Sequence, residues 1–241
     1  MSFRKIIFLF AFVFILSLSV MTAEVQLATS EWPPFEYTED GVQKGNDVKV
    51  IEAVFDKMGM KVEIKFYPWA RCVELAKKNQ IDGIFTLRKT PEREQFLYFP
   101  AEVLSVSENF FFYKKGKQYQ FTGVDDLKGL RIGITRGYAY GDELLSSKLF
   151  TLDEGMDDAT GFKKILADRI DLFACDQLVA FDLLKKNKIS DQILFLPKSI
   201  SKFDMYLAFT KKDANLELIK KFDQALKDLK ADGGYRKITG K

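Results

Sequence analysis

The sequence of 241 residues contains no histidine and only two cysteines. Histidine is the commonest general base and metal ligand, so its absence excludes Ser-His-Asp and Cys-His catalysis. Cys72 and Cys175 lie far apart, and an even cysteine count permits one disulfide in an oxidising compartment. We expect two free thiols, with a bridge as the alternative. We also expect no metal and no cofactor.

A membrane-spanning run is missing as well. The longest apolar run, residues 6–20, has about 15 residues, which is too short for a comfortable membrane span. The run follows Arg4 and Lys5 and ends shortly before the small residue Ala23. This order is typical of a secretory signal peptide that is cleaved near Ala23. We therefore expect an exported, soluble, periplasmic protein from which residues 1–23 are removed.

The charge balance does not favour a nucleic-acid partner. The formal net charge is +3, and it falls to +1 when residues 1–23 are removed. The remaining 218 residues contain no basic stripe and no low-complexity segment. That length is enough for one large domain or two small lobes. We expect an ordinary globular monomer that does not bind nucleic acid.

Strand-like and helix-like patterns alternate along the first half of the chain. Alternating apolar residues predict strands over 25–29 and 62–66, and a helix-period run over 48–58 lies between them. A helix over 69–78 and a strand over 81–85 complete a β-α-β-α-β unit. Such a unit is the usual source of a parallel sheet with helices on both faces.

A second unit of the same kind follows. Its predicted elements are a strand, a helix, a weak strand, a helix, a strand and a helix, at residues 130–135, 140–148, 151–155, 158–167, 170–175 and 177–186. The repetition predicts an α/β protein with two similar lobes rather than one sheet.

Two further strand-like runs, near residues 108–116 and 204–211, flank the second unit. We expect both runs to cross between the lobes and to act as a hinge. The first lobe then comprises residues 24–112 and 206–241, and the second comprises residues 113–205. Because ligands bind at the carboxyl ends of strands in open α/β sheets, we expect a ligand cleft between the lobes.

An unusual arginine marks one wall of this expected cleft. In residues 90–93 (TPER), Thr90 is a good N-cap and Pro91 fits the first helical position. Arg93 then lies near the positive end of the helix dipole, which is unfavourable unless an anion lies beside it. The pattern therefore predicts a carboxylate or phosphate site. The alternative is that Arg93 points outward and pairs with a neighbouring glutamate.

Several short motifs occur together in a characteristic order. They are WPPFEY at residues 32–37, GNDV at 45–48, TPER at 90–93, DLKGLRIG at 126–133 and DGGY at 232–235. In this order the chain resembles the extracellular solute-binding proteins of polar amino acid ABC transporters, solute-binding protein family 3. The resemblance covers essentially all of the chain after the signal peptide. It implies the two-lobed α/β periplasmic-binding-protein fold, in which two crossover strands join the lobes beside the ligand cleft.

The resemblance implies charged ligand contacts on both walls. Arg93 corresponds to the arginine that grips a ligand α-carboxylate, and Asp176 to the aspartate that pairs with the α-ammonium. A zwitterion needs a fixed cation and a fixed anion on opposite walls, and closure strengthens both pairs by removing water. Asp176 could instead be a plain N-cap for the helix that begins at Gln177.

Three aromatic residues are expected at the cleft. Trp32 follows the first strand, as does the aromatic residue that stacks on the ligand in this family, and Trp69 begins the second helix. The alternative is that both tryptophans are buried core residues. Tyr138 lies in a glycine-containing loop that could form a second anion cradle, and its bulk would narrow the pocket.

The chain departs from the family at residues 86–89 (TLRK), where members usually have small or hydroxyl residues. Thr86 keeps a hydroxyl group for the ligand site. Arg88, in contrast, adds a second cation five residues before Arg93. Arg88 indicates either a ligand with two carboxylates or a side chain that points to solvent.

The residues and the resemblance together predict a binding protein rather than an enzyme. We expect a periplasmic solute-binding protein that captures a small amino acid or a related carboxylate and delivers it to a membrane ABC transporter permease. Hinge closure is then the functional event. One alternative is an exported cyclohexadienyl-dehydratase-like enzyme on the same fold, with Glu31, Glu36 or Asp176 as its general acid. Another is a sensor component that presents the ligand to a receptor.

Overall fold

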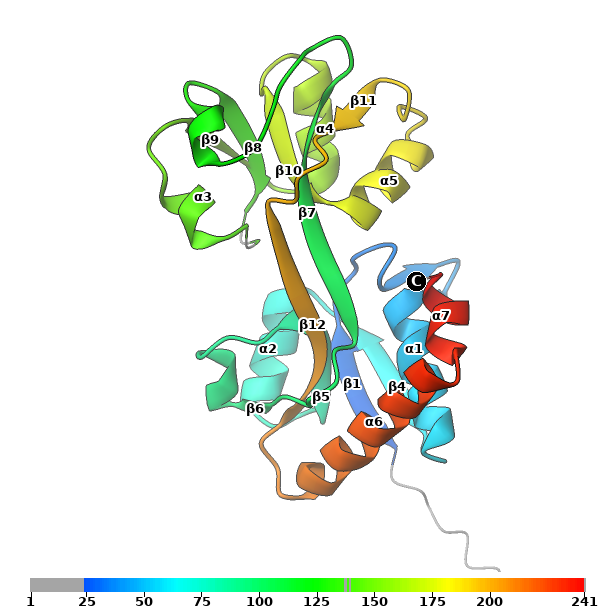
Figure 1. Ribbon diagram of the computed structural model, residues 1–241. Helices are drawn as coiled ribbons and strands as arrows, with labels where there is room; N and C mark the ends of the chain where they lie inside the picture. Colours follow the sequence, from blue (N-terminus) through cyan, green and yellow to red (C-terminus); the bar gives the residue numbers. More distant parts are fainter. Residues whose placement is uncertain (1–23, 137, 139, 241) are drawn as a thin grey trace, which may run out of the picture.

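The computed structural model describes residues 24–136, 138 and 140–240. The predicted signal peptide and its cleavage near Ala23 lie outside these residues. The described elements form two lobes that are joined by two long strands, β7 and β12 (Figure 1).

The first lobe begins with the predicted β-α-β-α-β unit. Its elements are β1 (Val25–Thr29), α1 (Asn46–Lys57), β4 (Val62–Phe66), α2 (Trp69–Lys77) and β5 (Gly83–Arg88). The three strands are parallel and lie in the order β4-β1-β5. The prediction for this unit is confirmed. Its signals were local, since the two apolar periodicities can be recognised without knowing any tertiary contact.

Shorter elements and two C-terminal helices complete the first lobe. They are β2 (Tyr37–Glu39), β3 (Val42–Lys44), a single 3-10 turn (Arg93–Gln95), β6 (Leu97–Tyr98), α6 (Ala214–Ala231) and α7 (Gly234–Thr239). The last two helices are separated by Gly233, whose φ of 79° lies in the left-handed region. Both helices lie beside α1 on the same side of the first lobe (Figure 1).

Two long strands, β7 (Ser105–Lys114) and β12 (Ser201–Thr210), run between the lobes (Figure 1). They pair with each other in antiparallel orientation. In addition, β12 pairs with β5 of the first lobe, and β7 pairs with β10 of the second. The sheet order is therefore continuous, β4-β1-β5-β12-β7-β10-β8-β9. The two predicted lobes are confirmed, but the expectation that they form separate sheets is wrong, because the crossover strands join both lobes into one hydrogen-bonded sheet.

The second lobe repeats the alternation of strands and helices. Its elements are a 3-10 turn (Val124–Leu127), β8 (Arg131–Thr135), α3 (Asp142–Ser146), β9 (Thr151–Gly155), α4 (Asp158–Leu166), β10 (Leu172–Asp176), α5 (Gln177–Lys186) and β11 (Ile193–Phe195). Strands β10, β8 and β9 are parallel neighbours. Helix α3 is shorter than the helix predicted over 140–148, because Gly141 has a φ of 96° and Ser147 is extended.

Each lobe has its own buried apolar core. In the first lobe, one cluster gathers residues of α1 and α6, and another gathers residues of α2. In the second lobe, one cluster contains residues of α4 and α5, and another contains α3. Phe35 is the exception, since it follows β1 in the first lobe but belongs to the buried cluster that contains Val179 and Ala180 of α5. It is only 2% exposed, so this side chain couples the two lobes.

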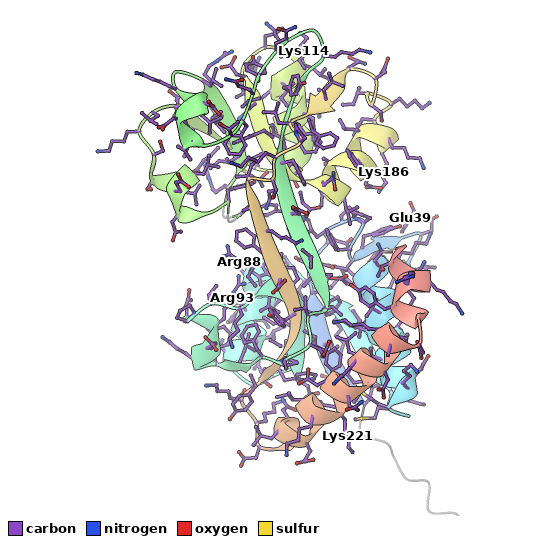
Figure 2. All side chains as sticks on the ribbon, viewed as in Figure 1. Glu39, Arg88, Arg93, Lys114, Lys186 and Lys221 are labelled. Carbon is purple, nitrogen blue, oxygen red and sulfur yellow. The ribbon has the colours of Figure 1, made fainter. Side chains whose placement is uncertain are left out.

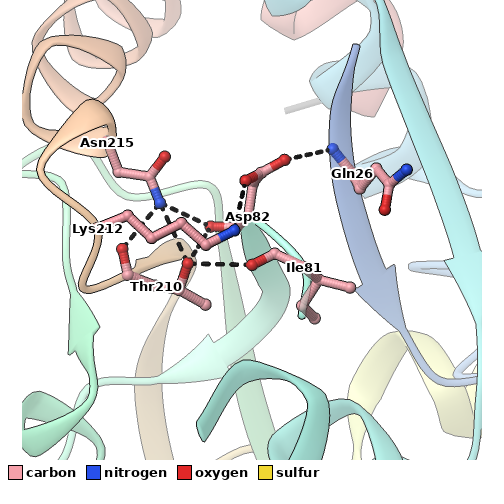
Figure 3. A network of polar contacts seen from close by, with 6 residues as sticks. All are labelled: Gln26, Ile81, Asp82, Thr210, Lys212 and Asn215. Carbon is pink, nitrogen blue, oxygen red and sulfur yellow. Dashed lines mark hydrogen bonds and ion pairs between the residues drawn. The ribbon is translucent and has the colours of Figure 1, made fainter. Parts of the chain in front are cut away.

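A polar network fixes the end of β12 to the first lobe (Figure 3). The Asp82 carboxylate accepts hydrogen bonds from Gln26 N and Lys212 Nζ, both at 2.9 Å. Asn215 Nδ2 donates to the backbone oxygens of Asp82 at 3.2 Å and Thr210 at 2.8 Å. The network joins β1, the residue before β5, and the junction between β12 and α6. One end of this crossover strand is therefore held firmly.

Both cysteines are free and buried, one in each lobe. Cys72 Sγ donates to the backbone oxygen of Thr29 at 3.2 Å. Burial raises the pKa of the Cys72 thiol to about 11, and it also raises the pKa of Cys175 well above its usual range. Neither thiol is activated as a nucleophile at neutral pH.

Candidate ligand site between the lobes

A cavity of about 360 Å³ lies between the lobes, beside the crossover strands. This volume suits a small molecule. The first lobe contributes Ser30, Glu31, Trp32, Glu36, Trp69, Thr86, Leu87, Arg88 and Arg93; the crossover strands contribute Ser107, Asn109, Phe203 and Met205; the second lobe contributes Arg136 and Tyr138. Six of the seven predicted site residues are in this set, and Asp176 is not.

Arg93 lies at the cavity in a single 3-10 turn and not at the start of an α-helix. Thr90 Oγ1 accepts a hydrogen bond from Arg93 N at 3.3 Å, but the N-cap of the turn is Glu92 and not the predicted Thr90. The helix-dipole argument is wrong, because so short a turn aligns too few peptide dipoles. The guanidinium is held locally instead: Nη1 donates to Arg88 O at 2.8 Å, and the group lies 5.5 Å from the Trp69 ring centroid.

Arg88, the last residue of β5, lies on the same wall of the cavity. Its guanidinium carbon is 3.5 Å from the ring centroid of Phe203 in β12, which is a cation–π contact. Figure 2 shows Arg88 and Arg93 on the first lobe beside the crossover strands. The side chain therefore faces the cavity and an aromatic ring, and the alternative of a purely solvent-directed Arg88 does not describe it.

Neither Arg88 nor Arg93 has an acidic partner within ion-pair distance in the described part of the chain. The residues outside that part contain no Asp or Glu. Burial lowers the pKa of both guanidinium groups, and the charge of Arg88 lowers the pKa of Arg93 further. Both remain cationic, because arginine does not lose its proton in proteins. An anion in the cavity would relieve their desolvation and their mutual repulsion.

Thr86 occupies a strained position in β5. Its φ of 57° is unusual for a β-branched residue. It is the extra residue of a β-bulge, since the register between β5 and β12 shifts between Tyr206 and Leu207. The bulge brings Thr86 Oγ1 to 2.8 Å from both Glu36 Oε2 and Asp47 Oδ2. Strained backbone of this kind is concentrated at functional sites.

The contacts of Thr86 with two buried carboxyl groups require a proton between them. One hydroxyl has one hydrogen, so Thr86 can donate to only one of the two. The other carboxyl must carry a proton and donate to Thr86 Oγ1. Ser105 Oγ already donates to Asp47 Oδ2 at 2.7 Å. Burial, followed by the charge of Asp47, raises the pKa of Glu36 well above its usual range, so Glu36 lines the cavity as a neutral acid.

Aromatic side chains form the apolar part of the cavity wall. Trp32 stacks on Phe35 at 4.6 Å between ring centroids, and Tyr138 of the second lobe meets Trp32 edge-on at 6.2 Å. Trp32 Nε1 is buried and has no hydrogen-bond partner among the residues that the structure describes. Trp32 and Trp69 both line the cavity and are only partly buried, which differs from the alternative of full core burial. Tyr138 remains 42% exposed.

Asp176 is the N-cap of α5 and lies outside the cavity lining. Its Oδ1 accepts hydrogen bonds from the backbone N–H groups of Leu178 at 2.9 Å and Val179 at 3.2 Å. Its Oδ2 accepts from Ser107 Oγ at 2.9 Å and Glu108 N at 3.0 Å. A carboxylate offers about four acceptor positions, so these four donors occupy it fully. The geometry therefore favours the N-cap alternative, with Ser107 between Asp176 and the cavity.

Sequence reasoning missed most of the wall that the crossover strands provide. Ser107 and Asn109 of β7 line the cavity, as do Phe203 and Met205 of β12. Each pair lies two residues apart, which is the spacing of one strand face. The alternation could have indicated such a face, but which face meets the cavity depends on pairing between strands that are distant in the sequence.

In the described chain, no group of three or more Cys, Asp or Glu side chains is arranged to hold a metal ion. A search of the same residues for a helix long and apolar enough to cross a membrane finds none.

Residues 25–241 match the family described as bacterial extracellular solute-binding proteins, family 3. The chain belongs to this family. One curated relative is the L-cystine-binding protein TcyJ of Escherichia coli strain K12, which is 24% identical over 213 residues, or 87% of this chain and 78% of the relative. Another is the arginine-binding extracellular protein ArtP of Bacillus subtilis strain 168. It is 26% identical over 217 residues, which are 88% of this chain and 83% of the relative.

Solved structures show the same fold. An ancestral arginine-binding protein bound to arginine aligns with a TM-score of 0.72 at 23% identity, over 89% of this chain and 96% of that one. A histidine kinase sensor domain with similarity to periplasmic binding proteins aligns with a TM-score of 0.71 at 19% identity, over 90% of this chain and 94% of that one. The predicted periplasmic-binding-protein fold is thus confirmed for this solute-binding protein.

Proposed function

We propose that this solute-binding protein captures a small amino acid or a related carboxylate and delivers it to a membrane ABC transporter permease. The observation that carries the proposal is Arg93, whose guanidinium lies at the cavity without an acidic partner in the described chain. The planar fork of arginine matches a carboxylate in a bidentate manner. The relatives named for cystine and arginine are named for ligands that share an α-carboxylate, the group that Arg93 would hold.

The remaining cavity residues position the ligand in this proposal. Trp32, Trp69 and Tyr138 supply apolar surface, and Thr86 supplies a hydroxyl oxygen. Asp176 acts through Ser107: the Ser107 hydroxyl donates to Asp176, so its lone pairs remain available for a ligand ammonium group. The charge of Asp176 then lies one hydrogen bond behind the cavity wall.

Closure of the two lobes around the ligand is the functional event in this proposal. The first lobe comprises residues 24–112 and 206–241, and the second comprises residues 113–205. The protein works as a monomer in the periplasm after removal of residues 1–23, with cleavage near Ala23. Ligand contacts with both lobes favour the closed state, and the permease receives the ligand from it.

Titration calorimetry of residues 24–241 against a panel of L-amino acids and small carboxylic acids tests the proposal. We expect saturable binding of at least one member. We expect Arg93→Gln to weaken that binding by about 100-fold, because a charge-assisted bidentate contact is lost. The matched control is Arg236→Gln, at an exposed position of α7. Unchanged affinity in a folded Arg93→Gln protein would overturn the site assignment, and absence of binding across the panel would overturn the function.

One observation bears on the dehydratase-like alternative. Glu36 lines the cavity as a neutral acid, which is the protonation state that a general acid requires. Proton NMR of a prephenate-like cyclohexadienyl acid incubated with the purified protein separates the two functions. Product formation that is lost in Glu36→Gln would favour the enzyme. An unchanged acid together with saturable amino acid binding supports the binding protein.

A further inference from the structure

More basic than acidic side chains face the cavity. Three arginines line it, namely Arg88, Arg93 and Arg136, together with two acidic residues, Glu31 and Glu36. Glu36 is neutral because it holds the proton of the buried carboxyl pair. Arg136 is already paired, since its Nε lies 3.1 Å from Glu154 Oε2. The cavity therefore holds two arginines that have no acidic partner among the described residues, Arg88 and Arg93, and one further acidic side chain, Glu31.

Arg88 is held in place by an apolar contact that leaves its donors free. The guanidinium lies 3.5 Å from the Phe203 ring centroid. Stacking on a ring fixes the plane of the group but uses none of its five N–H donors. No hydrogen bond from the Arg88 side chain to any described residue exists. A partly buried cation with all its donors unused is suited to receive an anion.

The two arginines are also fixed relative to each other. Arg93 Nη1 donates to the backbone oxygen of Arg88, so one side chain is attached to the backbone of the other residue. Each ring partner comes from a different element, Trp69 from α2 and Phe203 from β12. Two like charges held this way repel each other. A ligand with one anionic group would compensate only one of them.

We propose that the ligand carries two anionic groups, the first bound by Arg93 and the second bound by Arg88. The proposal rests on the proposed binding function and names the ligand class within it: a small dicarboxylic acid or an acidic amino acid. A ligand with a cationic side chain is disfavoured, because Arg88 would repel it. This distinguishes the chain from the relatives that are named for arginine.

The chain itself offers one competing partner for Arg88. Asp142, at the start of α3 in the second lobe, is the acidic residue whose charge acts on Arg88 in this structure. It is not within ion-pair distance of Arg88. If lobe closure brought the two together, Asp142 would neutralise Arg88 and the ligand would need only one anionic group. The experiment must therefore separate ligand charge from this internal pair.

Titration calorimetry with L-glutamate, glutarate, L-glutamine and L-arginine makes this separation, using the wild-type protein, Arg88→Gln and Asp142→Asn. We expect the wild type to bind L-glutamate or glutarate at least about tenfold more tightly than L-glutamine, and to bind L-arginine least. We expect Arg88→Gln to reduce the preference for the dianion to less than about threefold while L-glutamine binding persists. Asp142→Asn should leave the preference unchanged.

Two results would overturn the proposal that a second anionic group of the ligand binds Arg88, while leaving the proposed function intact. One is wild-type binding of L-glutamine or L-arginine as tight as that of L-glutamate. The other is a dianion preference that Arg88→Gln leaves unchanged. The same titration is also made with L-cystine, which has two carboxylates but no net charge. Tight L-cystine binding that Arg88→Gln weakens about tenfold supports a second carboxylate at Arg88, whereas L-cystine binding unaffected by Arg88→Gln contradicts it.

Discussion

The two walls of the cavity differ in what they offer a ligand. The first lobe supplies both unpaired arginines, both tryptophans and the strained Thr86. Among the residues that the structure describes, the second lobe supplies Tyr138, which is 42% exposed, and Arg136, which is paired with Glu154. In the proposed function, the first lobe therefore recognises the ligand and the second lobe covers it, so that binding to the first lobe precedes closure.

The lobes also differ in how they bury acidic groups. In the first lobe, Glu36 and Asp47 share a proton through Thr86 at the cavity wall. In the second lobe, Asp158 accepts a hydrogen bond from Thr135, and Asp176 accepts four hydrogen bonds as an N-cap. The first arrangement lies at the cavity wall, whereas Asp158 and Asp176 of the second lobe lie outside the cavity lining.

The largest effect is expected on stability, when the side chain of Phe35, which couples the two lobes, is removed. Phe35→Ala should lower the free energy of unfolding by about 3–5 kcal/mol, because it leaves a void in a cluster of the second lobe. Urea unfolding followed by circular dichroism measures this. The control is Phe181→Ala, because Phe181 is a phenylalanine of α5 that is 43% exposed. Equal losses in the two variants would mean that Phe35 does not couple the lobes.

The pH dependence of stability tests the buried acid of the second lobe. Burial raises the pKa of Asp158 to about 6. An acid with a raised pKa binds its proton more tightly in the folded state, so its contribution is present below about pH 4 and is lost as pH rises through about 6. The free energy of unfolding should therefore fall by about 2 kcal/mol between pH 4.5 and 7 from this group.

Asp158→Asn is the matched variant for that measurement, because asparagine keeps an oxygen to accept the Thr135 hydrogen bond but cannot titrate. The variant should show a correspondingly flatter pH profile in urea unfolding. A profile that is as steep as that of the wild type would assign the pH dependence to other groups.

A substitution on the covering wall should have a smaller effect on binding. Tyr138→Ala should weaken L-glutamate binding by less than about tenfold, because the ring contributes edge-on contact with Trp32 and no charge. Titration calorimetry with L-glutamate compares the loss of affinity in Tyr138→Ala with that in Arg88→Gln. If Tyr138→Ala costs more affinity than Arg88→Gln, the second lobe recognises the ligand and the contrast between the walls fails.

The smallest effect is expected far from the cavity, in the network that holds the end of β12 (Figure 3). Lys212→Met removes the ion pair with Asp82, in which the side chains are 31% and 26% exposed. Partly exposed pairs contribute little, so the free energy of unfolding should fall by about 1 kcal/mol or less, with ligand affinity unchanged. A change in affinity would show that the anchoring of β12 controls the site.

The sequence predicted the parts of the molecule that depend on local pattern. The β-α-β-α-β unit of the first lobe follows from apolar periodicity. The Thr90 hydroxyl accepts a hydrogen bond from Arg93 N, although Glu92 is the N-cap of that turn. Arg93 was recognisable as unusual because it follows a helix-start pattern, and Arg88 because family members usually have a small polar residue at that position. Nothing local could show that Arg88 stacks on Phe203, since the two lie on paired strands that are distant in the sequence.

Other features of the site depend on register and could not be predicted. The bulge at Thr86 exists because β5 and β12 pair with a shift, and it creates the shared proton with Glu36 and Asp47. Asp176 shows a second reason why the sequence was not sufficient. A residue that follows a strand and precedes a helix fits both an N-cap and a ligand contact, and only the four donors around it distinguish these roles.

The most direct test of the central claim is a crystal structure of residues 24–241 with L-glutamate. We predict one carboxylate within hydrogen-bond distance of the Arg93 guanidinium and the other within hydrogen-bond distance of Arg88. A well-ordered L-glutamate in the cavity whose carboxylates contact neither arginine would contradict it.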